Sequence, residues 1–195
     1  MEEFIFYSII LLWCLFLFHS FLLFLLFRQF GEIYLSSKEG IAKDGVSLGA
    51  TLPSAEAYSM INKKTVNIKG ISNKSSIILF LSPNCKPCRG IIDDWNKTQI
   101  SYSKDVTFVM VIVGEEKEVF YFNNKYKLNG EILWDESKGL FTRFKVRVTP
   151  FAFAIDRNGL INNKGLCGSK EQLDMYVQSI ISSEEEGGKS GDRYN

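Results

Sequence analysis

The chain has 195 residues, 46% of them hydrophobic, and its 23 Lys and Arg residues nearly match its 22 Asp and Glu residues. This length and composition exclude a polytopic membrane protein, a disordered chain and a multidomain assembly, and leave one membrane segment with one domain of average size. The net charge of +1 gives no basic excess that would favour a nucleic-acid partner.

The first predicted element is a membrane-spanning helix. Residues 4–27 contain no Asp, Glu, Lys or Arg. As a helix rising about 1.5 Å per residue they reach about 36 Å, enough to cross a bilayer. The chain starts with Met1-Glu2-Glu3 and lacks a small-residue cleavage site, which favours an uncleaved anchor over a signal peptide. We assign residues 1–28 to this anchor and interpret Cys14 and His19 as tolerated there, rather than as contacts to a partner helix.

Two arguments disagree about the side of the membrane on which the domain lies. No Lys or Arg precedes the apolar segment, whereas Arg28, Lys38 and Lys43 follow it, so the positive-inside rule places the domain in the cytoplasm. The chemistry of the domain favours the other side, because disulfide exchange on proteins is needed chiefly outside the cytoplasm. We expect a single-pass protein of the cell membrane with an extracytoplasmic domain.

Polar stretches flank the predicted domain. Residues 29–50 contain Gly, Ser and mixed charges with weak periodicity, which predicts a tether with some short helical content. Residues 183–195 are rich in Glu, Gly and Ser, which predicts a disordered tail. The domain therefore occupies residues 51–182.

Apolar patterns predict the strands of the domain. Continuous apolar runs at Ile77–Ser82 and Val106–Val113 are typical of buried strands. Weaker signals predict strands at Thr65–Lys69 and Ile132–Trp134, and a hairpin from Phe151 to Leu166 that turns at Asp156-Arg157-Asn158-Gly159.

Helices are predicted between and after these strands. An apolar face predicts a helix from near Cys85, and early acidic residues favour a second one at Glu115–Lys127. A short helix is predicted at Leu140–Phe144, and a capping box of Ser169 and Gln172 opens the last helix. The inward face of the first helix is formed by Cys88, Ile91, Ile92 and Trp95. This order of elements predicts an α/β fold, in which helices flank a central mixed sheet.

The main chemical signal is the motif Cys85-Lys86-Pro87-Cys88, directly after a buried strand and at the start of a helix. Unpaired N–H groups and the helix dipole stabilise a thiolate at Cys85, and Cys88, one turn further on, can close a small ring with it. Lys86 adds a positive charge beside the nucleophile. Pro87 suits a first turn, where its missing N–H is not needed. The pattern predicts a redox-active cysteine pair.

Half of a zinc site is the alternative interpretation of a C-x-x-C motif. It requires at least two further ligands, and the remaining candidates are Cys14 and His19 in the apolar segment and Cys167. A copper carrier would need a His in the domain, and the single His of the chain is His19. We predict no metal site and no cofactor beyond the disulfide. Cys167 is interpreted as a buried core residue rather than as a second redox partner.

Several segments resemble the thioredoxin-like redoxin family, and within it the membrane-anchored MauD and TlpA-like thiol-disulfide oxidoreductases. The matching segments are Leu26–Gly31, Gly49–Pro53, Ser82–Cys88, Val148–Phe151 and Ile155–Gly159. The resemblance implies a thioredoxin-like fold in which Cys85 is the attacking sulfur, Cys88 resolves the intermediate and Pro150 is a cis proline facing the pair. A cis bond at Pro150 leaves the backbone of Thr149 free to pair with an extended substrate.

The sequence departs from the thioredoxin pattern near the motif. Asn84 stands where thioredoxins carry Trp, and Lys86-Pro87 replaces Gly-Pro. The strand before the motif contains no acid, and Asp93 and Asp94 lie off the buried face of the helix. No proton acceptor for Cys88 is therefore identified.

Three functions fit the sequence. The first is a thiol-disulfide oxidoreductase, anchored in the membrane and extracytoplasmic, that acts on Cys-containing exported proteins or peptides and exchanges electrons with a membrane redox partner. The second is a thiol peroxidase, because Ser82-Pro83-Asn84-Cys85 fits the end of the peroxiredoxin pattern, although Ile78 stands where that pattern has Pro. The third is a non-catalytic scaffold for a maturation complex. Peroxide consumption would support the second function, and a phenotype retained after both motif cysteines become Ser would support the third.

Overall fold

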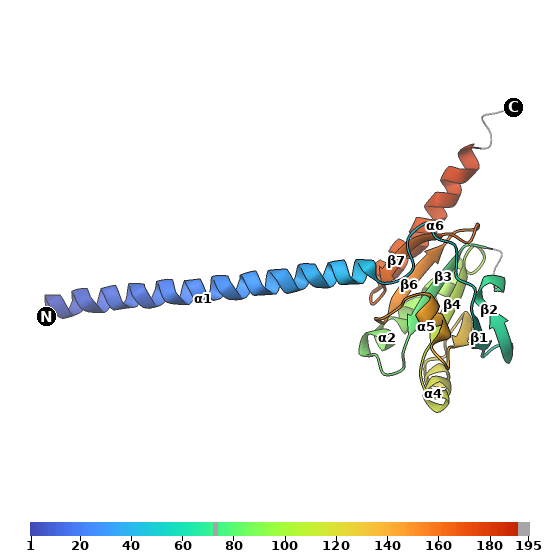
Figure 1. The fold of residues 1–195 in the computed structure, drawn as a ribbon, viewed down its shortest axis with the longest axis horizontal. Coiled ribbons are helices and arrows are strands. Elements are labelled where there is room, and N and C mark those ends of the chain that lie inside the picture. The colour runs from blue at the N-terminus through green and yellow to red at the C-terminus, as the bar shows by residue number, and fades with distance from the viewer. Residues whose placement is uncertain (72–73, 191–195) are drawn as a thin grey trace. The chain divides into compact units, whose positions relative to one another are not determined.

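The computed structural model describes residues 1–71 and 74–190, which form two compact units divided after Lys43. The first unit is a single helix, α1 (Glu2–Lys43) (Figure 1). Its segment Glu3–Leu26 has a mean hydropathy of 2.7, and its length and composition suit a membrane span. The helix includes residues 29–43, where the sequence predicts a tether, because extending an existing helix costs far less than starting one.

The second unit is built on a seven-stranded sheet with the order β2-β1-β5-β4-β3-β6-β7. Strands β3 (Ser76–Leu81), β4 (Thr107–Ile112) and β5 (Glu131–Trp134) are parallel to one another. The antiparallel strands are β1 (Glu56–Ser59), β2 (Lys64–Asn67), β6 (Phe151–Ile155) and β7 (Ile161–Leu166). The predicted mixed sheet flanked by helices is confirmed.

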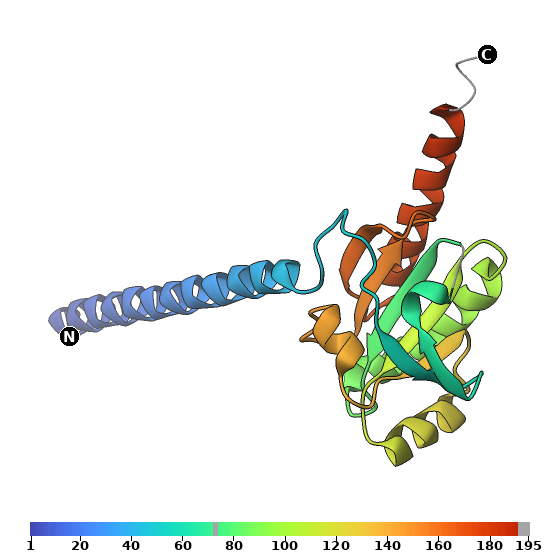
Figure 2. The same cartoon turned by 45° about the vertical axis from the view of Figure 1, so that its right-hand side comes forward.

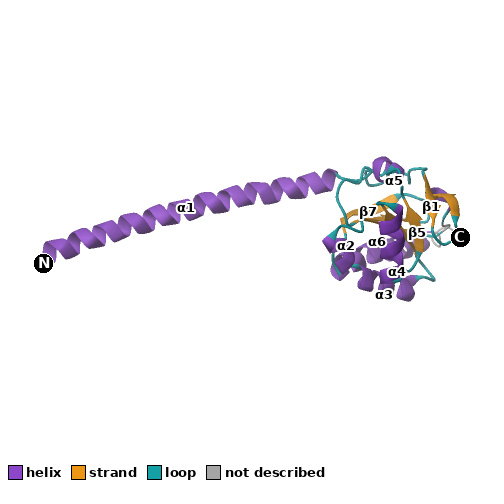
Figure 3. Ribbon diagram, turned by 90° about the horizontal axis from the view of Figure 1, so that it is seen from below, coloured by secondary structure: helices purple, strands orange, loops and turns teal. Residues whose placement is uncertain are grey.

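Helices cover both faces of this sheet (Figure 3). They are α2 (Lys86–Gly90), α3 (Ile92–Tyr102), α4 (Glu116–Tyr126), α5 (Gly139–Arg143) and α6 (Lys170–Ser190), with a 3-10 turn at Ile68–Gly70. Helices α3 and α4 lie on one face and α5 on the other. Helix α6 packs on β6 and β7 (Figure 2) and continues to Ser190, through residues for which the sequence predicts a disordered tail. Residues 191–195 of that tail lie outside the described residues.

The core has two layers, one on each face of the sheet. On the face that α3 covers, Trp95 is fully buried, packs edge-on against Phe108 at 5.1 Å, and donates its indole N–H to the carbonyl of Asn129. On the other face, Phe80 of β3 contacts three further rings at centroid distances of 5.0 to 5.7 Å. Those rings belong to Phe141, Phe144 and Phe153. The central strand β3 is thus enclosed by apolar side chains on both faces.

Two further elements, both in the second unit, differ from the prediction. The predicted helix from Cys85 is divided at Ile91 into α2 and α3, although its four predicted inward residues are all fully buried. Gly90 lies at the division and lowers the helical propensity there. The sequence analysis missed β1, because its four residues Glu56–Ser59 are half polar and gain their stability by pairing with β2 and β5.

A bend at Gly45 lies at the start of the second unit. Gly45 has φ +76°, and a Cβ placed on it would lie 2.9 Å from the Phe153 ring and 3.0 Å from the Phe151 ring. An L-residue is disfavoured at this position both by its backbone conformation and by the packing of those rings.

We expect Gly45→Ala to lower the free energy of unfolding by about 2–4 kcal/mol, the sum of a left-handed backbone cost and a steric cost. Gly49→Ala is the matched control, because Gly49 has φ +75° with open space around it. Its loss should be limited to about 1–2 kcal/mol. Urea unfolding of the full chain in detergent micelles measures both. Equal losses for the two variants would show that the contact with the rings contributes nothing.

Candidate active site

The cysteine motif lies at the carboxyl end of β3. Cys85 and Cys88 are joined by a disulfide, with their Cα atoms 5.2 Å apart. Cys88 is fully buried, whereas Cys85 is partly exposed. Lys86 and Pro87 are both exposed. Cys85 is therefore the sulfur of the pair that a partner molecule reaches from solvent.

Local helix geometry fixes the position of Cys85. It is the N-cap residue of α2, with an extended backbone at φ −84° and ψ 115°. The backbone N–H of Cys88 donates to Sγ of Cys85 at 3.2 Å, so the sulfur occupies the place of a capping side-chain oxygen. Pro87 lies in the first turn and leaves no N–H unsatisfied there. The same N–H that caps the helix can stabilise negative charge on this sulfur once the disulfide opens.

The loop before β6 forms the second wall of the site. The Thr149–Pro150 peptide bond is cis, as the resemblance implies. The carbonyl oxygen of Thr149 lies 3.4 Å from Sγ of Cys85, while the carbonyl of Pro150 accepts the N–H of Cys167 at 3.0 Å. Among residues 1–71 and 74–190, the N–H of Thr149 has no backbone partner. This arrangement leaves a free backbone donor beside the exposed sulfur.

The residues that follow α1 brace this loop. The N–H of Gly45 donates to the carbonyl of Lys145 at 3.0 Å, and the N–H of Val46 donates to that of Phe144 at 3.1 Å. Arg147 donates its Nε–H to the carboxylate of Asp44, which is buried. These bonds hold the residues directly before Thr149 in place.

Lys164 of β7 adds two hydrogen bonds to this brace, as we call the contacts between residues 44–46 and 144–147. Its Nζ donates to the carbonyls of Asp44 and Gly45, at 2.7 and 3.1 Å. Burial lowers the pKa of Lys164, and the nearby Asp44 carboxylate partly opposes that shift. The sequence analysis missed this brace because its members are distant in sequence, with Arg147 lying 103 positions after Asp44.

Two more contacts that the sequence does not indicate steady the motif itself. The side-chain amide of Asn84 donates to both carboxylate oxygens of Glu118, at 3.2 and 3.3 Å. Arg89 donates to the carbonyl of Pro83 at 3.4 Å. Asn84, which replaces the Trp of thioredoxins, thus links the motif to α4.

No proton acceptor for Cys88 emerges among the described residues. Strand β3 carries no acid, Asp93 is exposed and Asp94 is partly exposed. The described residues also contain no group of three or more His, Cys, Asp or Glu that could hold a metal ion.

Cys167 lies behind the site in the core. It is fully buried and unpaired, and burial raises the pKa of its thiol to about 12. The hydroxyl of the neighbouring Tyr176 donates to the carbonyl of Leu166 at 3.0 Å, and burial also raises the pKa of this hydroxyl. A neutral, enclosed thiol is a poor nucleophile, which fits the prediction of a core residue.

We expect Cys167 to resist alkylation in the folded protein at pH 8, because a thiol with so high a pKa is almost wholly protonated and is enclosed as well. Full-length Cys14→Ser protein in detergent is treated with iodoacetamide before and after unfolding in urea, and modified peptides are counted by mass. Modification should appear only after unfolding. Equal rates in the two states would contradict the burial of this residue.

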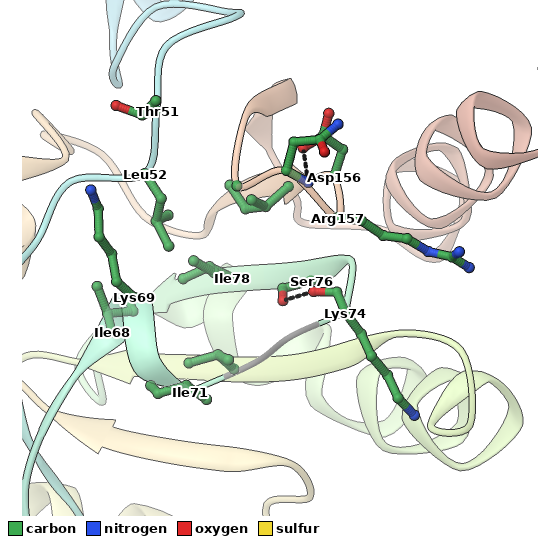
Figure 4. A pocket seen from close by; sticks show the side chains of 14 residues that line it. Thr51, Leu52, Ile68, Lys69, Ile71, Lys74, Ser76, Ile78, Asp156 and Arg157 are labelled. Carbon is green, nitrogen blue, oxygen red and sulfur yellow. Dashed lines mark hydrogen bonds between the residues drawn. The ribbon is translucent and has the colours of Figure 1, made fainter. Parts of the chain in front are cut away.

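A cavity lies at the amino end of β3, opposite to the end that carries the cysteine motif (Figure 4). It encloses about 390 Å³ and is lined by Ser76 at the start of that strand, by Leu52 and Ile78, and by several polar side chains. Lys69, Lys74 and Arg157 lie around it, but their charged ends point in different directions. The cavity is thus separated from Cys85 by the length of a strand and gathers no convergent set of polar groups.

Comparison with known proteins identifies the family. The AhpC/TSA family model matches residues 48–164. The chain belongs to the AhpC/TSA family. It is 27% identical to the methylamine utilization protein MauD of Paracoccus versutus over 88% of this chain and 87% of MauD. It is also 25% identical to the thiol-disulfide oxidoreductase ResA of Bacillus cereus, over 71% of this chain and 81% of ResA.

Solved structures confirm the thioredoxin-like fold. A putative thiol:disulfide interchange protein DsbE from Chlorobium tepidum superposes with a TM-score of 0.63 at 19% identity, covering 69% of this chain and 97% of that one. A putative protein disulfide isomerase from Bacteroides thetaiotaomicron gives a TM-score of 0.64 at 18% identity, covering 75% and 95%. Family, fold and paired cysteines class this AhpC/TSA protein as a thioredoxin-like thiol-disulfide oxidoreductase.

Proposed function

We propose that this protein is a membrane-anchored oxidoreductase that exchanges disulfides with Cys-containing exported proteins or peptides through Cys85 and Cys88. The observation that carries the proposal is the contact set around Cys85. Its sulfur is partly exposed, accepts the N–H of Cys88 at 3.2 Å, and lies 3.4 Å from the carbonyl oxygen of Thr149. A substrate whose sulfur bonds to Cys85 is thus placed beside the backbone of Thr149, whose N–H has no backbone partner among the described residues.

The exchange proceeds in two displacements. In the reduced protein, the Cys85 thiolate attacks one sulfur of a substrate disulfide, forms a mixed disulfide and releases the other substrate sulfur as a thiolate, which takes a proton from water. Cys88, as a thiolate, then attacks Sγ of Cys85 and releases the second substrate sulfur. The substrate gains two electrons and the protein loses two. Run in reverse, the same steps oxidise a substrate dithiol.

The structure supports distinct roles for the two cysteines. Cys88 is enclosed and held by the helix backbone, so only its neighbour Cys85 is within its reach. Thr149 and Pro150 would align the substrate: the free N–H of Thr149 can pair with an extended chain in the manner of an added strand. These features favour exchange with a protein chain over the peroxidase and scaffold alternatives, which make no use of an unpaired backbone N–H beside the sulfur.

We expect Cys88→Ser to accumulate a mixed disulfide with a model substrate such as insulin, because the resolving thiol is absent. Cys85→Ser should form no adduct and should reduce insulin no faster than buffer. Cys167→Ser is the matched control and should retain wild-type turnover, because its thiol is enclosed. Non-reducing gels and insulin turbidity with dithiothreitol as electron donor measure these outcomes. An active Cys85→Ser variant would refute the assignment.

Anchoring is the second part of the proposal. Glu3–Leu26 is apolar enough and long enough to span a bilayer, and none of it is buried within the protein. An extracytoplasmic domain agrees with a chemistry that oxidising compartments need, although the three basic residues after the segment favour the cytoplasm. A membrane redox partner would then exchange electrons with the Cys85–Cys88 pair.

We expect a membrane-impermeant maleimide to reach Cys85 in intact cells, because Cys85 is partly exposed whereas Cys88 is buried. The full chain carries Cys14→Ser and Cys167→Ser, so that no thiol outside the motif is labelled, and labelling is compared before and after a reductant. Labelling of Cys85 that requires the reductant indicates an oxidised external pair, and labelling without it indicates a reduced external pair. Labelling that occurs only after lysis would place the domain in the cytoplasm and contradict the proposed location.

A further inference from the structure

A groove of about 460 Å³ adjoins the cysteine pair, between the ends of β3 and β4 and the segment around α5. Two of its lining residues also contact Cys85. The carbonyl of Ser82 accepts the N–H of Cys85 at 3.1 Å, and that of Thr149 lies 3.4 Å from the Cys85 sulfur. A peptide segment joined to Cys85 can therefore extend directly into this groove.

The charged residues that line the groove are all basic. They are Lys138, Lys145 and Arg147, and no described acidic side chain lines it. Arg147 is already paired with Asp44. In contrast, neither Lys138 nor Lys145 forms an ion pair with a described carboxylate, and both are exposed. The groove thus presents two exposed amines, and neither forms an ion pair with a described carboxylate.

The two lysines lie on either side of α5. Both adopt the left-handed backbone conformation, Lys138 at φ 58° and Lys145 at φ 56°, and they bracket the single turn of α5. The carbonyl of Lys145 accepts the N–H of Gly45, which ties this side of the groove to the brace. The groove also has an apolar part formed by Phe141 and Val146, which are largely buried.

An acidic hollow lies on the other side of Lys138. Glu115, Glu116 and Glu136 line that hollow, which shares Val113 and Lys138 with the groove. The charged side chains are therefore grouped by sign. Basic residues line the groove next to Thr149, and glutamates line the hollow on the other side of Lys138. The basic groove therefore attracts an acidic chain, whereas the acidic hollow repels it. Opposite charges across such a contact raise the rate of productive encounter.

We propose that the basic groove binds the substrate segment that flanks its reactive cysteine, and that this segment is acidic and carries an apolar side chain. The inference rests on the proposed exchange function and names the class of substrate. Carboxylates of the segment contact Lys138 and Lys145, its apolar side chain packs on Phe141 and Val146, and its cysteine sulfur reaches Cys85.

The test measures the first displacement alone. The full chain in detergent micelles carries Cys14→Ser and Cys88→Ser, and each probe is a single-Cys peptide linked by a disulfide to nitrothiobenzoate. The Cys85 thiolate bonds to the peptide sulfur and releases the coloured nitrothiobenzoate thiolate, whose absorbance gives the rate constant. The three peptides differ only at the two positions next to the apolar residue. These positions are both Glu, both Gln or both Lys. At low ionic strength the Glu peptide should react about 5-fold faster than the Gln peptide, and about 0.5 M salt should remove this advantage.

Charge reversal separates the groove from the overall charge of the protein. Lys145→Glu should abolish or invert the Glu-to-Gln rate ratio. Lys104→Glu makes the same change just before β4, at the opposite end of the sheet, and should leave the ratio unchanged. Equal effects of the two variants, or a wild-type ratio of one, would overturn the inference. If no peptide releases nitrothiobenzoate, the proposed exchange function itself fails.

Discussion

The complete burial of β3 is the constraint on which the site depends. Every residue of this strand is enclosed, between the Trp95 layer on one face and the Phe80 rings on the other. A strand held in this way cannot shift its register without disrupting the close packing of both core layers. Its end point is fixed as a result, and the residues just beyond Leu81 must leave the sheet at its carboxyl edge. Cys85 emerges there, at the first turn of α2, where the backbone supplies the N–H that its sulfur needs.

The second constraint is the brace between residues 44–46 and 144–147. It couples three parts of the chain that are distant in sequence: the residues that follow α1, the segment after α5 and Lys164 of β7. Because Thr149 follows shortly after Arg147, the bonds that residues 44–46 make within the domain also position the backbone next to Cys85. A thiol-disulfide oxidoreductase needs such stiffness, since the attacking sulfur, the resolving sulfur and the substrate sulfur must approach along one line.

Local signals in the sequence predicted the motif cysteines, the helix that follows them and the buried strand before them, because each depends on a short-range pattern. The cis proline opposite the cysteines was predicted from the family resemblance instead, and the structure places it in the loop that contacts Cys85. Features that arise from pairing between distant segments were not accessible. Strand β1 has too few apolar residues to show a period, and the Asp44–Arg147 pair has no sequence signature. The helical state of residues 29–43 depends on continuation of α1 rather than on their own propensity, and the basic groove needs α5 to be folded against the sheet.

The central claim is that Cys85 and Cys88 form a reversible redox couple, and a redox titration tests it most directly. The full chain is equilibrated in detergent with dithiothreitol mixtures of graded oxidation, quenched with acid and alkylated, and the modified cysteines are identified by mass. The account predicts one two-electron transition in which Cys85 and Cys88 gain and lose modification together. A disulfide that stays closed across the whole range, or a pairing that shifts to include Cys167, would contradict it.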